Sequence, residues 1–296
     1  MKITNNGKGV SYCMFSKASR ELKEHYGYYI GLFILQIVIM LVVQTVISMF
    51  MPTNPALVEM ATMSPQEMSA FDPVQYTNML TDQYTGLSGV LNLVSMFIST
   101  LISVLVTRSI FQKINYSETT LTDSALFNTN PEHALILPFK VFVANLLMTL
   151  LIIVVMGVGI LLIIRMMDSG GPSLIIALGL FLVMLVIAVI VSPISYLIAY
   201  DVERRYNFWT SFTKGISVGT KHFGRIFKTI ISIVLLFILF FAIVGTVITM
   251  IMHSTNSILI GGVLGLVAFL VLIFWLAPFN LIYMAETMNE VIAKEY

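Results

Sequence analysis

Six long apolar runs constrain this chain more than any other feature of its sequence. They occupy residues 28–51, 86–110, 136–164, 173–200, 230–252 and 257–284. A helix needs about 20 residues to cross the roughly 30 Å hydrocarbon core of a bilayer, and each run is long enough to do so. Charged residues make up 10% of the chain, whereas soluble domains carry roughly 25%. We therefore predict an all-α, polytopic membrane protein whose six transmembrane helices form helical hairpins.

Positive charge alternates between the two sides of the predicted membrane domain. Lys and Arg gather before the first run, around residues 108–140 and in the segment 204–228. The connections on the other side contain one basic residue, Arg165. Because cytoplasmic connections carry an excess of Lys and Arg, we expect both termini to be cytoplasmic. We predict a multi-pass protein of a bacterial plasma membrane.

The same pattern divides the chain into three regions. We predict a cytoplasmic amphipathic segment at 1–27, a six-span membrane domain at 28–284 and a cytoplasmic tail at 285–296. The membrane domain includes the long external loop 52–85, in which Ser-Pro-Gln-Glu and Asp-Pro are typical of short helix starts, and a cytoplasmic interfacial helix at 204–228.

Part of the first segment recurs later in the chain. Residues 15–27 begin with FSKA and end with HYG, and residues 212–224, which lie 197 positions further on, begin with FTKG and end with HFG. Each copy leads into an apolar run. Glycine permits a sharp change of direction, so we predict that each interfacial helix bends into its span at Gly27 or Gly224.

The segment 204–228 has two opposite faces when placed on a helix. Basic residues form one stripe, and aromatic and aliphatic residues form the other face, which is typical of a helix lying in the membrane interface. The residues predicted to bind lipid headgroups or a partner are Lys17, Arg20, Lys23, Lys214, Lys221, Arg225 and Lys228. The expected ligands are anionic membrane lipids. The alternative is that these charges only fix the orientation of the chain.

The spans contain few polar residues. Gln36, Gln44, Asn145 and Asn280 either form hydrogen bonds between helices or line a polar path. Pro193 and Pro278 predict helix kinks, since proline removes a backbone donor, and Asn280 is placed to satisfy the opened backbone.

No pattern in the sequence points to catalysis. There is no nucleophile elbow, P-loop or Gly-rich dinucleotide fingerprint. The histidines on the predicted cytoplasmic side, His25, His133 and His222, lack close ligand spacing. We expect no catalytic residues, cofactor, metal ion or nucleic-acid partner.

Several short motifs are similar to a known family. Segments 200–203, 212–217 and 221–227, together with 16–27 and 275–286, contain an acidic span end, a serine-bearing helix and a lysine-histidine-aromatic elbow. They resemble a bacterial family of six-span integral membrane proteins of unknown function (DUF975-like), itself related to the membrane domain of glycerophosphodiester phosphodiesterases. The resemblance implies a fold and no activity, because the phosphodiesterase catalytic domain is not found in this sequence.

Three hypotheses about function follow from these observations. The first is a non-enzymatic membrane protein, protective or accessory, that organises lipids or partner proteins at the inner leaflet. The second is the permease subunit of a transporter that works with a separate ATPase. The third and least favoured is a membrane enzyme. The sequence predicts no oligomeric state.

Overall fold

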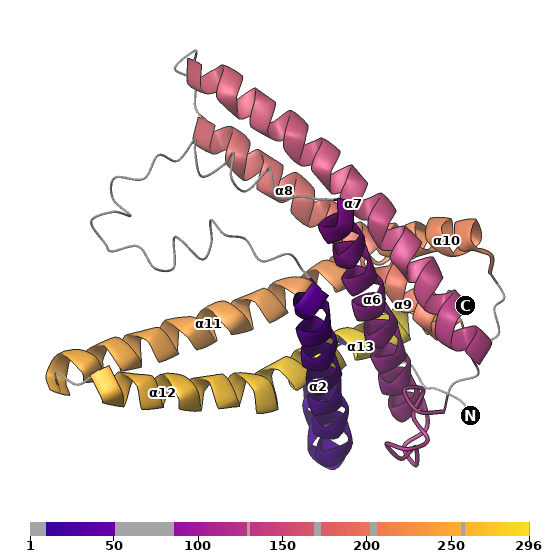
Figure 1. Ribbon diagram of the computed structural model, residues 1–296, viewed down its shortest axis with the longest axis horizontal. Helices are drawn as coiled ribbons and strands as arrows, with labels where there is room; N and C mark the ends of the chain where they lie inside the picture. Colours follow the sequence, from indigo (N-terminus) through magenta and orange to yellow (C-terminus); the bar gives the residue numbers. More distant parts are fainter. Residues whose placement is uncertain are drawn as a thin grey trace.

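The computed structural model describes residues 10–50, 86–128, 131–168, 173–201, 206–255 and 258–295, and these are all-α (Figure 1). The predicted external loop 52–85 with its short helices lies outside the described residues, as do Arg204 and Arg205. The helices are α1 (Val10–Glu24), α2 (Tyr26–Phe50), α6 (Gly86–Asn115), α7 (Pro131–Asp168), α8 (Ser173–Val191), α9 (Pro193–Tyr200), α10 (Phe208–Lys221), α11 (Phe223–Thr255), α12 (Ile258–Val271), a π-helix (Leu272–Leu276) and α13 (Ala277–Ala293).

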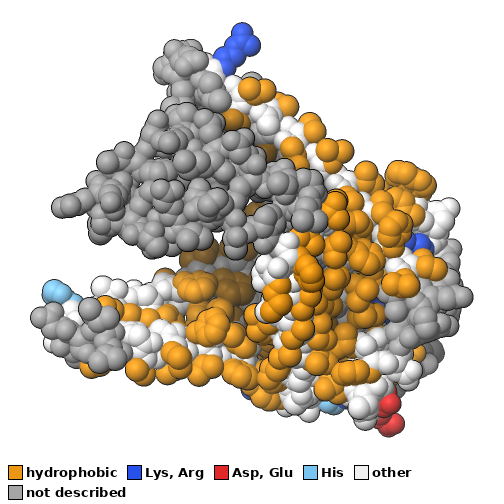
Figure 2. Space-filling model, viewed as in Figure 1, with side chains coloured by type: hydrophobic (Ala, Val, Ile, Leu, Met, Phe, Trp, Pro, Cys, Tyr) orange, Lys and Arg blue, Asp and Glu red, His pale blue; other side chains and the backbone are white. Residues whose placement is uncertain are grey.

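Six helices are long and apolar enough to cross a membrane, which confirms the predicted fold class. Four of them are α2, α6, α7 and α11, and the other two are the continuous pairs α8–α9 and α12–α13. In the most apolar stretch of α11 none of the residues is buried inside the chain. Figure 2 shows hydrophobic side chains covering the long helices on this face. An apolar surface of this extent requires lipid around it.

Two hairpins extend from the rest of the bundle in different directions (Figure 1). One is formed by α7 and α8, and the other by α11 and α12. Each hairpin has a close approach at a glycine. A Cβ atom on Gly159 would lie 2.5 Å from the Leu180 side chain, and one on Gly261 would lie 2.5 Å from Met252 Sδ. The small residues therefore allow the paired helices to pack closely.

Helix α13 is the central element at one end of the bundle. It packs against α1, α6, α9 and α11, and most of its side chains from Pro278 to Ile292 are buried. The predicted tail 285–296 starts within this helix, which continues the sixth span to Ala293. The tail and the span are thus one element over most of that length.

Helix interruptions lie at both of the prolines that sequence analysis singled out. Ser192 separates α8 from α9, which begins at Pro193. The π-helix separates α12 from α13, in which Pro278 is the second residue. Asn280 does not satisfy the opened backbone as expected, because neither of its side-chain amide atoms has a hydrogen-bond partner among the described residues.

The sequence repeat corresponds to two matching helix elbows. His25 separates α1 from α2, and His222 separates α10 from α11. In both, the histidine carbonyl accepts hydrogen bonds at 3.0–3.2 Å from two backbone N–H groups in the next helix. The predicted bends at Gly27 and Gly224 are wrong by two residues, because the histidine carbonyl caps the new helix before the glycine is reached. We call the end of the bundle that carries both histidines the elbow end.

Candidate functional site

Helix α1 docks on α13 through one narrow face. Met14, Ala18 and Leu22 recur every four residues, and all three are buried. The phenyl ring of Phe15, on the edge of this face, packs edge-on against Phe279 with ring centres 4.9 Å apart. These contacts fix α1 across the sixth span.

Helix α10 docks through the equivalent face, 197 positions later. Ser211, Gly215 and Gly219 are buried against α8 and α9. A Cβ atom on Gly219 would lie 2.0 Å from the backbone oxygen of Ile190, so the two backbones are in contact. Small residues at this spacing permit such an approach.

The aromatic side of α10 differs from the prediction as a result. We expected it to face the bilayer, but Phe208, Phe212 and Ile216 are half-buried against the protein core. Trp209 alone among the aromatics of α10 is exposed, at 64%. The small-residue face of α10 sets its orientation, because Gly215 packs against Ile194 of α9 and Gly219 packs against Ile190 of α8.

Three of the predicted basic residues meet glutamates at the C-terminal end of the chain. Lys17 Nζ lies 2.5 Å from Glu286 Oε2, Arg225 Nη1 lies 2.7 Å from Glu290 Oε1, and Lys221 Nζ lies 2.9 Å from Glu295 Oε2. The two elbows are thereby linked to α13 and the residues after it.

Glu286 and Glu295 have contrasting environments. The Glu286 carboxylate is 1% exposed, and its Oε1 has no hydrogen-bond partner among the described residues. Glu295 lies at the surface, where the hydrogen bond from Lys221 and the nearby His222 lower the pKa of its carboxyl group. One pair is embedded in the elbow end, and the other is open to solvent.

The other four predicted basic residues are less constrained. Lys214 contacts the Tyr206 hydroxyl and lies over its ring. Arg20 Nε lies 3.9 Å from Glu24 Oε1, a distance at which exposed pairs contribute little. Lys23 and Lys228 are exposed and form no hydrogen bond or ion pair within the part of the chain that the structure describes.

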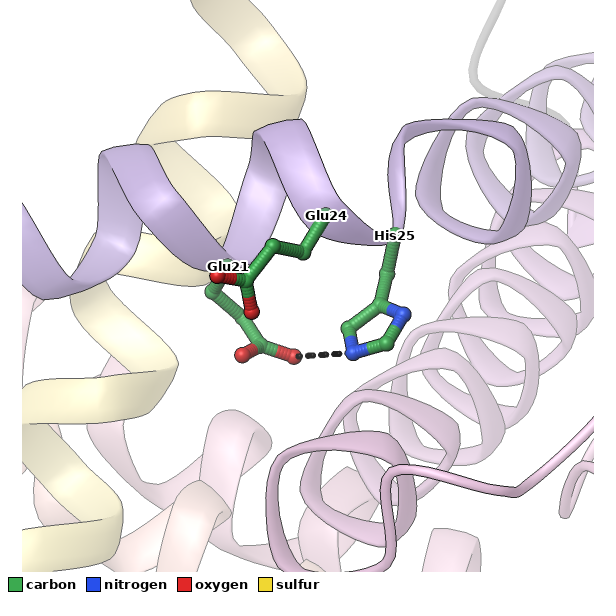
Figure 3. Close-up of side chains that lie close together, drawn as sticks. All are labelled: Glu21, Glu24 and His25. Carbon is green, nitrogen blue, oxygen red and sulfur yellow. Dashed lines mark ion pairs between the residues drawn. The ribbon is translucent and has the colours of Figure 1, made fainter.

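A cluster of possible metal ligands surrounds the first elbow (Figure 3). Ligand atoms of Glu21, Glu24 and His25 lie within 4.8 Å of one another. His25 Nε2 lies 3.9 Å from Glu21 Oε1, and Glu21 also accepts a hydrogen bond from Tyr29 Oη at 2.9 Å. The signal in the sequence for this cluster is the Glu21–His25 spacing of four, which places both side chains on one helix face. Because Glu21 accepts the hydrogen bond from Tyr29 in the next helix, we infer that it stabilises the elbow.

The structure does not bring the predicted polar lining residues together. Gln44 Nε2 donates to Ser95 Oγ at 2.8 Å, which is a hydrogen bond between α2 and α6. Gln36 Oε1 is buried without a partner among the described residues, as are both amide atoms of Asn280. Asn145 lines a cavity among the described residues.

That cavity is a polar groove of about 350 Å³ between α6, α7 and α9, a volume in the range of small-ligand pockets. Its polar lining residues are Ser99, Thr100, Ser103, Thr107, Asn145, Ser195 and Tyr196. Three of the four on α6, namely Ser99, Ser103 and Thr107, recur every four residues and therefore share one helix face. This spacing is the signal in the sequence from which the groove could have been predicted.

Arg108 follows the last of these hydroxyl residues. Its side chain is 6% exposed, and its Nε and Nη1 atoms have no hydrogen-bond partner among the described residues. From the sequence, Arg108 was predicted only to help orient the chain in the membrane. Burying an ion without a partner costs several kcal/mol. In the described part of the chain, Arg108 is therefore the residue that most needs an anionic partner.

Comparison of the chain with protein-family models, with curated proteins and with solved structures found no match. The family resemblance of the short motifs is therefore not supported by a match over the chain. What the findings establish is a polytopic membrane protein with six candidate membrane-spanning helices.

Proposed function

We propose that this chain is a non-enzymatic protein of a bacterial plasma membrane that binds and organises anionic lipid at the inner leaflet. In this proposal the elbow end lies at the cytoplasmic surface. The excess of Lys and Arg in the connections at that end supports this orientation.

The matched docking of α1 and α10 carries the proposal. Each helix immediately precedes a span and presents its small or apolar face to a proline-interrupted helix. This arrangement leaves aromatic side chains in or next to the two docked helices, Phe15, Tyr26 and Trp209, exposed. Aromatic rings prefer the headgroup region, and basic residues beside them attract anionic lipid.

The basic residues divide by their contacts. Lys17, Lys221 and Arg225 are held by glutamates. Arg20, Lys23 and Lys228 are exposed and are held weakly or not at all by the described residues. We assign headgroup binding first to these three.

The test is the lipid composition around the purified protein. The protein is extracted in native membrane discs from a bacterial host, and anionic lipid in the discs is compared with that in the bulk membrane. Each basic residue near an anionic surface contributes about 1 kcal/mol. The triple variant Arg20→Gln, Lys23→Gln, Lys228→Gln removes about 3 kcal/mol of attraction and should therefore reduce the enrichment of anionic lipid at least tenfold.

Arg165→Gln is the matched control. Arg165 is an exposed residue of α7, near the end opposite the elbows, so its removal should leave the enrichment unchanged. Equal lipid compositions for the unchanged chain and the triple variant would overturn the proposal.

The groove between α6, α7 and α9 favours a second candidate function, a permease subunit that works with a separate ATPase. A polar cavity within the spans is what a substrate path needs. This candidate requires a stoichiometric ATPase to copurify in mild detergent. A preparation that retains its lipids and contains no ATPase would refute it.

A further inference from the structure

Arg108 is a buried cation without an anion. Its burial leaves two guanidinium nitrogens without acceptors among the described residues. Buried charges in proteins are ordinarily paired and hydrogen-bonded. A guanidinium has a planar fork of donors that matches the oxygens of a phosphate or carboxylate. The ligand that fits these free donors is therefore an oxyanion.

The position of Arg108 places it beside the polar groove. It follows Thr107 in the chain and lies one helical turn after Val104, and both of these residues line the groove. Long side chains on a helix lean toward its N-terminus, which for Arg108 is the direction of Val104 and the groove. Arg108 itself is not among the residues that line the groove, so a ligand there would be bound when the guanidinium group turns into the elbow-end edge of the cavity.

The depth of the site suits a lipid headgroup. Arg108 lies seven residues before the end of α6 at Asn115, about 10 Å along the helix axis. The hydroxyl row of Ser99, Ser103 and Thr107 continues from there toward the middle of the span. A phosphate at Arg108 would have acceptors and donors for its glycerol and ester groups along this row.

We propose that Arg108 and the groove bind one phosphorylated amphiphile, with its phosphate at the guanidinium and its glycerol backbone along the α6 hydroxyls. This inference deepens the proposed function and rests on it, since it adds one tight site to the exposed basic surface. The shared chemistry is a glycerol phosphate, which could come from a lipid or from a soluble ester.

Native mass spectrometry of the purified chain tests the proposal. The probe is phosphatidylglycerol added to delipidated protein in detergent, with glycerol 3-phosphate as a soluble competitor. The unchanged chain should hold one phosphatidylglycerol molecule. Arg108→Gln should weaken this binding by at least about tenfold, because the lost hydrogen bonds are charge-assisted. Equal binding by the two proteins would overturn the proposal.

Two further variants keep the test decisive if Arg108→Gln does not fold. Thr107→Val retains the side-chain shape and removes one hydroxyl of the groove, and Ser103→Ala removes another. Each should weaken phosphatidylglycerol binding severalfold, whereas the exposed control Arg165→Gln should not. Binding unchanged in both groove variants would also contradict the proposal.

The competitor identifies the source of the ligand. Displacement of the lipid by glycerol 3-phosphate supports a site that also accepts soluble phosphate esters, and retention of the lipid supports a site for lipid only. The triple variant Arg20→Gln, Lys23→Gln, Lys228→Gln should keep the single tight lipid while losing surface enrichment. This separates failure of the groove site from failure of the proposed function.

Discussion

At the scale of single residues, the buried charges differ in how they are compensated. Lys17 supplies the only ion-pair partner of Glu286 among the described residues, and its own side chain is 45% exposed. The two members of the pair therefore have unequal access to solvent. The lysine can turn toward water when it loses its partner, and the glutamate cannot.

This asymmetry predicts unequal effects of mutation. Lys17→Met keeps the aliphatic stem and leaves Glu286 buried without its cation, so it should destabilise the chain by about 2 kcal/mol, below the full cost for a completely buried pair. Glu286→Gln leaves only a half-exposed lysine unpaired and should cost about 1 kcal/mol or less. Thermal unfolding in detergent checks the order of the two variants. A greater loss for Glu286→Gln would contradict it.

Glu295 gives a prediction about pH. Its pKa is lowered from the ordinary value of 4.5 by the hydrogen bond from Lys221 and by His222. A carboxyl group with a depressed pKa stabilises the folded state above its unfolded pKa, and the contribution is lost as the pH falls through the folded pKa. Carbon NMR of labelled glutamate should show Glu295 titrating below 4.5, and Lys221→Gln should move the titration back up. A value at or above 4.5 in the unchanged chain would refute the contact.

At the scale of elements, the two interfacial helices α1 and α10 pack against the spans in the same way. Both present every fourth residue to a span that is interrupted beside a proline, and both end at a histidine. They differ in the size of the buried side chains. Those of α1 are apolar and mostly large, and those of α10 are very small. Helix α10 therefore approaches its partner more closely and is the less tolerant of substitution.

Gly219→Ala tests this packing. The new Cβ atom would lie 2.0 Å from the backbone oxygen of Ile190, and neither atom belongs to a flexible side chain. We expect a loss of about 2 kcal/mol in stability, as for other overpacked sites. Gly224→Ala is the control, because nothing lies within 4 Å of its Cβ position, and it should be neutral or stabilising. Thermal unfolding that does not distinguish the two variants would contradict the backbone contact.

The sequence predicted elements of this kind better than it predicted their contacts. Apolar length was enough to find the six spans, and the spacing of 197 residues was enough to pair the elbows. The orientation of α10 could not be predicted, since it depends on the close contacts of Gly215 and Gly219 with Ile194 and Ile190, on either side of the break between α8 and α9. Lys17 and Glu286 are 269 positions apart, and no local pattern relates them. The groove was partly visible in the spacing of Ser99, Ser103 and Thr107.

At the scale of the whole molecule, the apolar surface and the charged surface lie in different regions. The long hairpins expose hydrophobic side chains (Figure 2), while the elbow end has the ion pairs of Lys17, Lys221 and Arg225 with glutamates. A bilayer would cover the former, and the headgroups and solvent of one leaflet would meet the latter. The proposed function depends on that leaflet being the inner one.

The most direct measurement is therefore the accessibility of single cysteines from the two sides of the membrane. Cys13→Ser removes the natural thiol, and Arg165→Cys or Lys228→Cys is then introduced at an exposed residue near one end or the other. An impermeant maleimide should label position 165 in intact bacterial cells and position 228 only after permeabilisation. Labelling of both positions in intact cells, or the reverse pattern, would contradict an elbow end at the inner leaflet.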